Sequence, residues 1–443
     1  LNFPYLFDVC KPDVLSEYPG YKTKGEEKAG ELYLLPPNDS APKVCIIDSG
    51  IQEGHRFIAP CIDSAMSKCY IPGKTDVADH VKNGGHGTRV GGAVLFPRTI
   101  PTSGRHQLSF WLQNARVLNE QNKLPDELFP PAMLKAIVDR YHFNSSGTRI
   151  FNHSITGFYP CRSRHMSAWA ATIDQLSWEA DILFIVAAGN LKAEFPGPIR
   201  LGIANHLAAN RQYPQFLMED SCRIANPAQS FQALTVGSIC HTALNNPPWT
   251  SFGDIDYPSV FSATGLGIWG VIKPDVVEYG GDMARDTGNP PNISYRPELC
   301  PELIRSTLYG GPGVARDNAG TSFAVPKVAH IAAAIQQELP DEPCLLYRAL
   351  IAQSARWPKW ADTISDSERI RILRHIGYGL PDIERATTNN NYSVTLITNG
   401  SIPIKAREAH IYQVPIPAKL RTPGEEHDIL IEITLSYKAR PRR

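Results

Sequence analysis

Four short segments carry, in order along the chain, side chains that together could transfer an acyl group. They place Asp48 in Ile-Ile-Asp-Ser-Gly, His86 in Gly-Gly-His-Gly-Thr, Asn190 in Ala-Ala-Gly-Asn and Ser322 in Gly-Thr-Ser-Phe-Ala. A serine hydroxyl attacks a carbonyl when a histidine takes its proton and a buried carboxylate orients that histidine. An asparagine amide can donate a hydrogen bond to the oxyanion that forms. These residue types therefore suit acyl transfer to a serine.

Each of these residues also has an ordinary structural interpretation when it is considered alone. Asp48 could cap a turn after a strand, and Asn190 could occupy a left-handed turn position. His86 could be a surface turn residue or a metal ligand, and Ser322 could be a helix N-cap. No second His or carboxylate follows His86 at the spacing of a metal ligand, which favours a general base. The order of the whole set, more than any single residue, favours catalysis.

Strands and helices that alternate along the chain must position these residues. Apolar runs without in-out alternation are typical of a parallel sheet covered on both faces, and they predict strands at 44–47, 115–118, 150–154, 182–188 and 234–239. Helical patterns predict helices at 88–95, 131–141, 167–179, 322–338 and 343–355. We therefore expect an α/β fold, with a doubly wound, mostly parallel sheet and helices on both faces. In such folds ligands bind beyond the carboxyl ends of the strands.

The predicted α/β domain covers residues 43–387 and lies between two smaller segments. The N-terminal arm, 1–42, is polar and irregular, and we expect it to pack on the main domain. Two stretches, at about 192–225 and 254–318, interrupt the alternation, and insertions of this length near active sites are commonly functional. The last segment, 388–443, is predicted to be a small β-rich module, because apolar and polar residues alternate at 392–397, 410–416 and 428–437.

Composition argues against several other classes of protein. The 443 residues include 44 acidic and 44 basic side chains, so no excess charge predicts binding to nucleic acid or to a membrane surface. No apolar run is long enough to span a bilayer, and the first residues do not have the pattern of a signal peptide. The nine cysteines form no CxxC pair, which argues against structural zinc and is typical of a reducing compartment. These features predict a protein without a metal site or other cofactor.

The four motifs, in this order, resemble those of the subtilisin-like serine proteases, or subtilases. The resemblance runs from about residue 43 to residue 335, and it implies that Asp48, His86 and Ser322 are catalytic and that Asn190 lies in the oxyanion hole. The order of the triad, and Gly-Thr-Ser in place of G-x-S-x-G, argue against an α/β-hydrolase esterase. The resemblance further implies that an extended substrate binds at Ser154, Ile155, Thr156, Gly157, Ala187, Ala188 and Gly189.

The sequence departs from the family pattern at two positions. Arg89 stands where the family usually has His, and Phe323 stands where it usually has Met. Calcium is a cofactor of the family, but no acidic cluster in this sequence maps onto its sites. The segments 273–281 and 425–437 resemble a bacterial intracellular group of subtilases that is paired with an AAA-type ATPase and linked to plasmid incompatibility or phage defence. That resemblance implies a cytoplasmic bacterial protein with such an ATPase as partner.

The leading hypothesis is a serine endopeptidase that acts on protein or peptide substrates. The alternative is a protease-like regulatory module that stays inactive until a partner such as an AAA-type ATPase acts, because the insertions and the last segment could cover the cleft.

Overall fold

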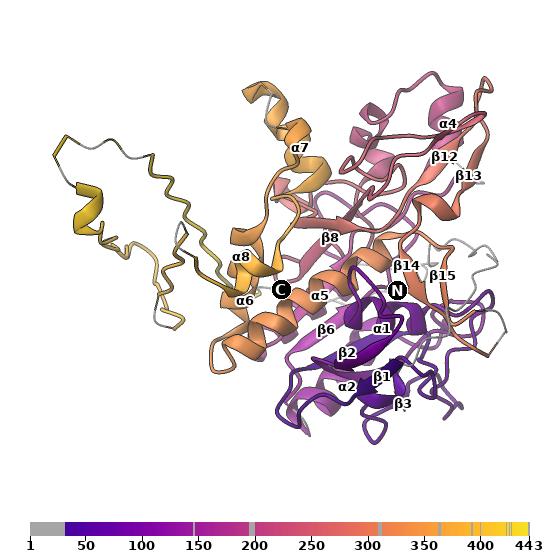
Figure 1. Cartoon of the computed structure of the whole chain (residues 1–443), viewed down its shortest axis with the longest axis horizontal. Helices are drawn as coiled ribbons and strands as arrows, with labels where there is room; N and C mark the ends of the chain where they lie inside the picture. Colours follow the sequence, from indigo (N-terminus) through magenta and orange to yellow (C-terminus); the bar gives the residue numbers. More distant parts are fainter. Residues whose placement is uncertain are drawn as a thin grey trace, which may run out of the picture.

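A seven-stranded parallel sheet lies at the centre of the computed structural model (Figure 1). The structure describes residues 32–144, 147–194, 200–308, 312–361, 365–390, 393–398, 400–421, 423–424, 426 and 428–441. The strands follow the order β11-β8-β7-β6-β2-β5-β3 across the sheet. Their bounds are β2 Lys43–Asp48, β3 Lys68–Cys69, β5 Trp111–Arg116, β6 Ile150–His153, β7 Leu183–Ala187, β8 Leu234–Ile239 and β11 Val276–Tyr279.

Helices cover both faces of this sheet. Alternate side chains of β2 point to opposite faces, so Val44 and Ile46 join one apolar cluster while Cys45 and Ile47 join another. The first cluster includes α1 Gly87–Leu95, α5 Thr321–Glu338 and α6 Cys344–Ser354. The second includes α2 Pro130–Val138 and α3 Ala168–Glu179. The predicted doubly wound α/β fold is therefore confirmed.

Two of the predicted elements have clearly different limits in the structure, whereas the others in the α/β domain differ by at most one residue at either end. The apolar run 115–118 extends past the end of β5 at Arg116. Val117 and Leu118 lie outside the strand because their N–H groups both donate to Asp48 O, at 2.8 and 3.3 Å. They therefore curl around the end of β2 instead of extending the ladder. Helix α2 ends at Val138 and continues as a π-helical turn, η2 Asp139–Phe143.

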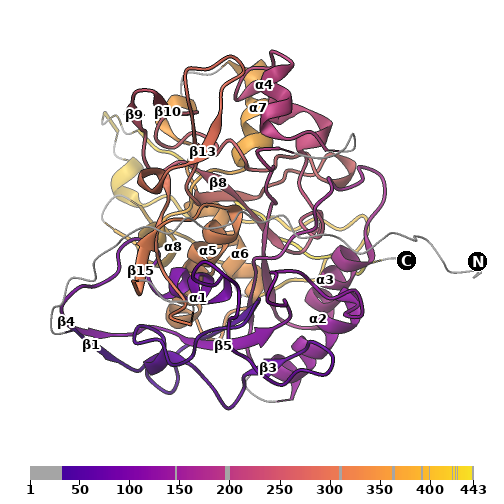
Figure 2. The same ribbon diagram turned by 90° about the vertical axis from the view of Figure 1, so that its right-hand side faces the viewer.

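The two insertions build a lobe beside the main sheet (Figures 1 and 2). Residues 192–225 contribute the short helix α4 Ile203–Ala208. An antiparallel sheet in the order β13-β12-β10-β9 lies in and just before residues 254–318, whereas the β14–β15 hairpin of the same stretch packs against α1 and not in this lobe. Phe216, Phe261 and Met283 share one buried cluster, so both insertions pack on a common core. The bounds are β9 Asn245–Asn246, β10 Trp249–Ser251, β12 Met283–Arg285, β13 Ile293–Tyr295, β14 Glu302–Ile304 and β15 Val314–Arg316.

Further short elements complete the body of the molecule. Strand β1 Leu32–Leu35 pairs in parallel with β4 Gly104–Gln107. Most of the predicted N-terminal arm, residues 1–31, lies outside the described residues. Helices α7 Asp366–Ile376 and α8 Ile383–Thr387 follow α6. The 3₁₀ turns are η1 Ala59–Cys61, η3 Gln215–Met218, η4 Asp220–Cys222, η5 Ile268–Gly270, η6 Pro297–Leu299, η7 Lys359–Ala361 and η8 Ala418–Arg421.

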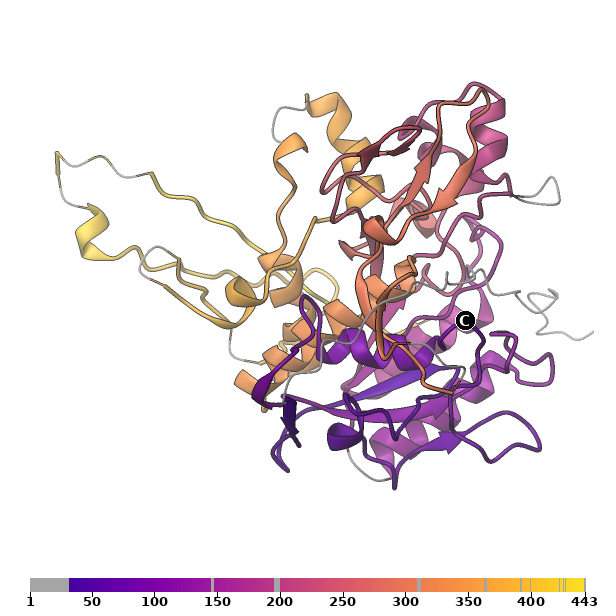
Figure 3. The ribbon, with the colours of Figure 1, turned by 45° about the vertical axis from the view of Figure 1, so that its right-hand side comes forward.

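The segment after α8 extends away from the body as a long loop (Figures 1 and 3). Its apolar side chains are exposed, for example Ile411 at 93% and Leu430 at 81%. Among the described residues of 388–443, an isolated bridge between Asn390 and Ser393 is the only β pairing. The end of the segment returns to the body, where Lys438 Nζ donates to Ser177 O at 3.2 Å. The β-rich module stays a prediction. In the described part of the chain, no helix has the length and apolar character needed to cross a membrane.

Candidate active site

The predicted site residues meet at one edge of the central sheet. Strands β7, β6 and β2 are neighbours and run parallel, so their carboxyl ends lie together. Asp48 ends β2, Ser154 directly follows β6, and Asn190 comes three residues after β7. His86 and Ser322 come from two helix starts, those of α1 and α5, that pack on the same face. Segments far apart in the sequence thus converge on one place.

Asp48 and His86 form a buried, charge-assisted pair. His86 Nδ1 lies 2.6 Å from Asp48 Oδ1, and the two residues are 3% and 1% exposed. The same carboxylate oxygen accepts the Ser49 N–H at 2.7 Å, which fixes the carboxylate in position. A carboxylate that holds Nδ1 in this way leaves Nε2 as the ring nitrogen that can accept a proton. This is the geometry that a general base requires.

The start of helix α1 is held by Asp79, a residue that the sequence analysis did not single out. Asp79 Oδ2 accepts the N–H groups of His86 and Thr88, at 2.8 and 3.0 Å, and so caps the helix from the loop that precedes it. Its other oxygen accepts the Ser49 hydroxyl at 3.0 Å, which links this cap to the end of β2. Burial raises the pKa of the Asp79 carboxyl above its usual range, and the N–H groups of Thr88 and Val81 oppose that shift. A single Asp in an irregular loop offers no local pattern by which this role could be recognised.

Glycine at position 87 allows helix α1 to begin directly against the end of β2. A Cβ atom on Gly87 would lie 2.1 Å from Gly50 O and 3.1 Å from the Asp48 Cβ. Any side chain here would therefore push the helix, and His86 with it, away from Asp48. Position 87 thus requires glycine for a steric reason.

Ser322 lies in the first turn of α5, beside the strand-end residue Ser154. Its hydroxyl donates to Ser154 O at 3.1 Å, and the Ser154 hydroxyl donates to Ser322 O at 3.0 Å. The ring of Phe323, the next residue, lies 5.5 Å from the His86 ring, centroid to centroid. The helix start that carries the serine is therefore adjacent to the histidine. It is also adjacent to the predicted substrate-binding strand.

Asn190 is oriented by Thr321, which precedes Ser322. Asn190 Oδ1 accepts both the N–H and the hydroxyl of Thr321, at 2.9 and 3.0 Å. Because Oδ1 is held by Thr321, Nδ2 lies on the other side of the amide, next to Gly320. A Cβ atom on Gly320 would lie 3.3 Å from Nδ2. The amide donor is thus fixed next to the start of α5.

The predicted substrate-binding segments are held by backbone hydrogen bonds. The N–H of Gly157 donates to Asn226 O at 2.6 Å, so the segment after β6 runs beside residues 224–226. Ala188 and Gly189 are also tied into the body, because Ala225 N donates to Ala188 O and Ala263 N donates to Gly189 O, at 2.8 and 3.0 Å. Gly189 has a φ of 108°, which suits glycine alone at this close turn. Ile155, Thr156 and Ala187 are buried.

The unusual Arg89 belongs to a buried charge network that joins the two helix starts. Arg89 Nη2 lies 3.1 Å from Asp317 Oδ1, and Arg305 Nε lies 3.1 Å from Asp317 Oδ2. All three side chains are at most 3% exposed. Both arginines also donate to Asn83 O, at 2.6 and 2.9 Å. Because Asp317 lies five residues before Ser322, the network ties α1 to the segment that leads into α5.

Replacement of Asp317 by Asn should destabilise the fold strongly. The two arginines would remain buried without their shared carboxylate, and breaking a buried ion pair costs about 3–5 kcal/mol. Urea denaturation measures the change in the free energy of unfolding. The exposed Asp39 offers a matched Asp→Asn control, for which we expect a change within about 0.5 kcal/mol. Equal stability of the Asp317 and Asp39 variants would contradict the structural role of the network.

Among the described residues, no three His, Cys, Asp or Glu side chains gather as metal ligands would. The calcium that the family resemblance implies therefore has no assigned residues, and the expectation of a protein without a cofactor stays a prediction.

Comparison with known proteins gives matches over most of this region. The model of the "Subtilase family" matches residues 39–379. The uncharacterized protein y4bN of Sinorhizobium fredii (strain NBRC 101917 / NGR234) is 30% identical over 292 residues, which cover 61% of this chain and 62% of that protein. The serine protease AprX of Bacillus subtilis (strain 168) is 30% identical over 167 residues, or 37% of this chain and 28% of that protein. The chain thus matches less than two thirds of the length of either relative.

Two crystal structures resemble the chain in three dimensions. A lanthipeptide protease aligns with a TM-score of 0.49 and 17% identity, over 78% of this chain and 86% of that one. A cold-adapted subtilisin-like serine proteinase aligns with a TM-score of 0.44 and 20% identity, over 74% of this chain and 88% of that one.

Proposed function

Because the chain belongs to the subtilase family of serine peptidases, we propose that it is an endopeptidase with Ser322 as its nucleophile. The single observation that carries this proposal is the 2.6 Å contact between His86 Nδ1 and Asp48 Oδ1, next to the helix start that holds Ser322. Its substrates are proteins or peptides, as those of the family are.

The reaction proceeds by acyl transfer to Ser322. The Ser322 hydroxyl turns from Ser154 O toward His86 Nε2, which takes its proton as the oxygen attacks the substrate carbonyl. The same imidazolium then gives its proton to the leaving amine. Asp48 holds the ring in this tautomer and stabilises its positive charge. Water repeats the sequence to release the acyl group.

Two donors stabilise the oxyanion of the tetrahedral intermediate. The N–H of Ser322 lies in the first turn of α5, where backbone donors have no acceptor within the helix. The second donor is the amide of Asn190, whose orientation is set by Thr321. The positive end of the α5 dipole supports the same negative charge.

Replacement of Asn190 by Ala should lower kcat by about 10²–10³ with little change in KM, because the donor acts on the transition state. The magnitude comes from subtilisin. The variant also leaves the Thr321 N–H without its acceptor, so some stability should be lost as well. Thr321→Val removes only the hydroxyl contact and serves as the control, with kcat expected within a few-fold of wild type. A kcat loss of the same size in both variants would argue against an oxyanion role.

An active-site probe tests the proposal directly. A fluorophosphonate should label the isolated chain, and peptide mapping by mass spectrometry should find the adduct on Ser322, with none in Ser322→Ala. The regulatory alternative expects no labelling until a partner acts. Labelling of the isolated chain would exclude that alternative, and failure to label under any condition would exclude the endopeptidase.

We further propose that the substrate binds as an extended strand along Ser154, Ile155, Thr156 and Gly157. The support is the position of this segment, which follows β6 and contacts the Ser322 hydroxyl through Ser154 O. Paired strands gain affinity from backbone hydrogen bonds and specificity from side-chain pockets. The AAA-type ATPase partner and the cytoplasmic location stay predictions.

A further inference from the structure

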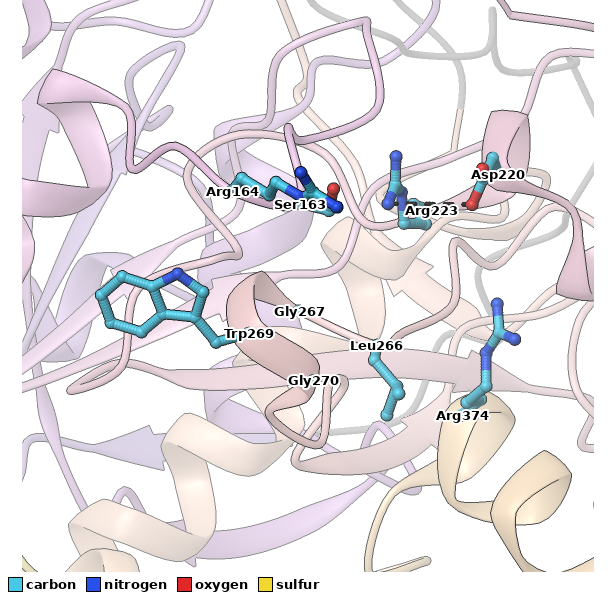
Figure 4. A pocket seen from close by; sticks show the side chains of 9 residues that line it. All are labelled: Ser163, Arg164, Asp220, Arg223, Leu266, Gly267, Trp269, Gly270 and Arg374. Carbon is cyan, nitrogen blue, oxygen red and sulfur yellow. Dashed lines mark ion pairs between the residues drawn. The ribbon is translucent and has the colours of Figure 1, made fainter. Parts of the chain in front are cut away.

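A cavity of about 380 Å³ lies where both insertions meet helix α7 (Figure 4). One wall comes from the segment that continues beyond the predicted substrate-binding strand. The side chains that line the cavity are those of Ser163, Arg164, Asp220, Arg223, Leu266, Trp269 and Arg374, with Gly267 and Gly270. The cavity is separate from the cluster of Asp48, His86 and Ser322.

Positive charge dominates this cavity. Three arginines, Arg164, Arg223 and Arg374, line it, and Asp220 is the one carboxylate among the lining residues. Figure 4 shows Arg223 between Arg164 and Asp220, with Arg374 rising from α7 toward them. The pair between Arg223 Nη1 and Asp220 Oδ1 is long, at 3.7 Å, and the Asp220 side chain is 88% exposed. Such an exposed pair offsets little of the positive charge.

The arginine side chains are positioned but not saturated by the protein. Arg374 donates from Nε to Gly265 O and from Nη2 to Met218 O, both at 2.8 Å, which holds its guanidinium at the cavity. A guanidinium has five N–H donors, so most of its donors remain for a ligand. Arg223 Nε is buried and has no hydrogen-bond partner among the described residues. Burial lowers the pKa of Arg374, Asp220 opposes this shift, and the positive charge of Arg223 adds to it.

Hydrogen bonds connect one wall of the cavity to the predicted substrate-binding strand. The buried Arg200 donates to Phe158 O at 2.7 Å and to Arg223 O at 3.3 Å, and so links the strand to the cavity. Cys161 N donates to Ile224 O at 2.8 Å, which continues the pairing that begins at Gly157. Ser163 comes six residues after Gly157, so the two lie at most about 22 Å apart. An extended peptide of about seven residues or fewer can therefore reach from one to the other.

We propose that this cavity binds a carboxylate of the polypeptide substrate, several residues away from the scissile bond. The carboxylate belongs to an Asp or Glu side chain or to the C-terminus of the substrate, since guanidinium groups bind both in the same way. The inference rests on the proposed function, because it takes the ligand to be the substrate. It makes the two insertions a specificity device, which selects substrates with an acidic residue at a fixed separation from the cleavage site.

The test measures peptide binding without turnover, by fluorescence anisotropy on Ser322→Ala. The probes are fluorescein-labelled twelve-residue peptides with a C-terminal amide, one with three consecutive Glu and one with three Gln at the same positions. We expect the Glu peptide to bind about tenfold more tightly at low salt, as one charge-assisted contact would give. A third peptide, with Gln and a free C-terminus, shows which kind of carboxylate is bound.

Arginine variants locate the effect. Arg164 is exposed and none of the described residues accepts a hydrogen bond from it, so Arg164→Gln should fold normally and reduce the preference for Glu. Adding Arg223→Gln to Arg164→Gln should reduce the preference for Glu further, to less than about twofold in this double variant. Arg105→Gln, at an exposed arginine on β4, is the matched control and should keep the full preference. Thermal melts by circular dichroism verify folding of each variant.

Equal binding of the Glu, Gln and free-acid peptides by Ser322→Ala with all three cavity arginines intact would overturn the proposal. A loss in Arg105→Gln as large as that in Arg164→Gln would overturn it too, because the preference would then be a general effect of charge. Failure of the proposed function gives a different result. In that case the fluorophosphonate leaves Ser322 unlabelled, whereas the preference for Glu persists.

Discussion

Ser322→Ala should abolish peptide cleavage while leaving the fold intact. The substitution removes one oxygen, which among the described residues makes a single hydrogen bond, to Ser154 O at 3.1 Å, so little stability should be lost. The loss in kcat should be on the order of 10⁶, a magnitude that comes from subtilisin itself. The residual rate over water should persist, since Asn190 and the α5 N-terminus still bind the oxyanion.

A fluorogenic peptide assay and a thermal melt check this prediction together. The exposed Ser103 supplies a matched Ser→Ala control, which should keep wild-type turnover. Turnover by Ser322→Ala near the wild-type rate would remove the serine from the mechanism. Loss of turnover together with loss of the folded state would instead assign Ser322 a structural role.

Asp48→Asn should lower kcat by about 10⁴, the size of loss known for this replacement in a triad. Asp48 Oδ1 accepts from both Ser49 N and His86 Nδ1, so an Asn could keep these contacts only with its oxygen in that place. Its NH₂ group would then lie at the buried Oδ2 position, which accepts no hydrogen bond from the described residues. The opposite orientation would turn the NH₂ toward His86 and favour the wrong tautomer. Neither orientation supplies the charge that stabilises the imidazolium.

Steady-state kinetics separate this effect from a loss of substrate binding. We expect kcat to fall while KM changes little, because the carboxylate acts on the histidine and not on the substrate. Asp63→Asn is the control and should keep kcat. It alters a carboxylate near the same sheet that accepts a hydrogen bond from Gln113. A fall in kcat of less than tenfold in Asp48→Asn would mean that His86 is oriented by other groups.

The cap of helix α1 shows where sequence analysis reached its limit. His86 and Gly87 lie in a recognisable glycine-rich motif, but Asp79 lies in an irregular loop and acts through hydrogen bonds to residues seven and nine positions later. The Arg89 network is similar, since Asp317 is 228 residues away in the sequence. Arg89 could be noticed as a departure, but its partners could not be named. Contacts of this kind depend on which loops the folded chain brings together.

In the last segment, by contrast, a clear local pattern was present but its partner in the fold was not specified. Alternation of apolar and polar residues at 428–437 predicts a strand, because side chains of a strand point to opposite faces. A strand also needs a partner for its backbone, and no local pattern specifies that partner. In the structure residues 428–437 form no strand and carry exposed apolar side chains, such as Ile433 at 85%.

The ordered Asp48, His86, Asn190 and Ser322, together with the strand ends and helix starts that carry them, were determined by the sequence itself. This was possible because hydrophobic periodicity and glycine-rich turns are local patterns, formed by residues that are neighbours in the sequence. Only the tertiary structure decided that His86 Nδ1 lies 2.6 Å from Asp48, that Asp79 and the Arg89 network hold the helix starts, and that three arginines face one cavity. These features depend on packing between distant segments, where distance and burial set the strength of every charge interaction.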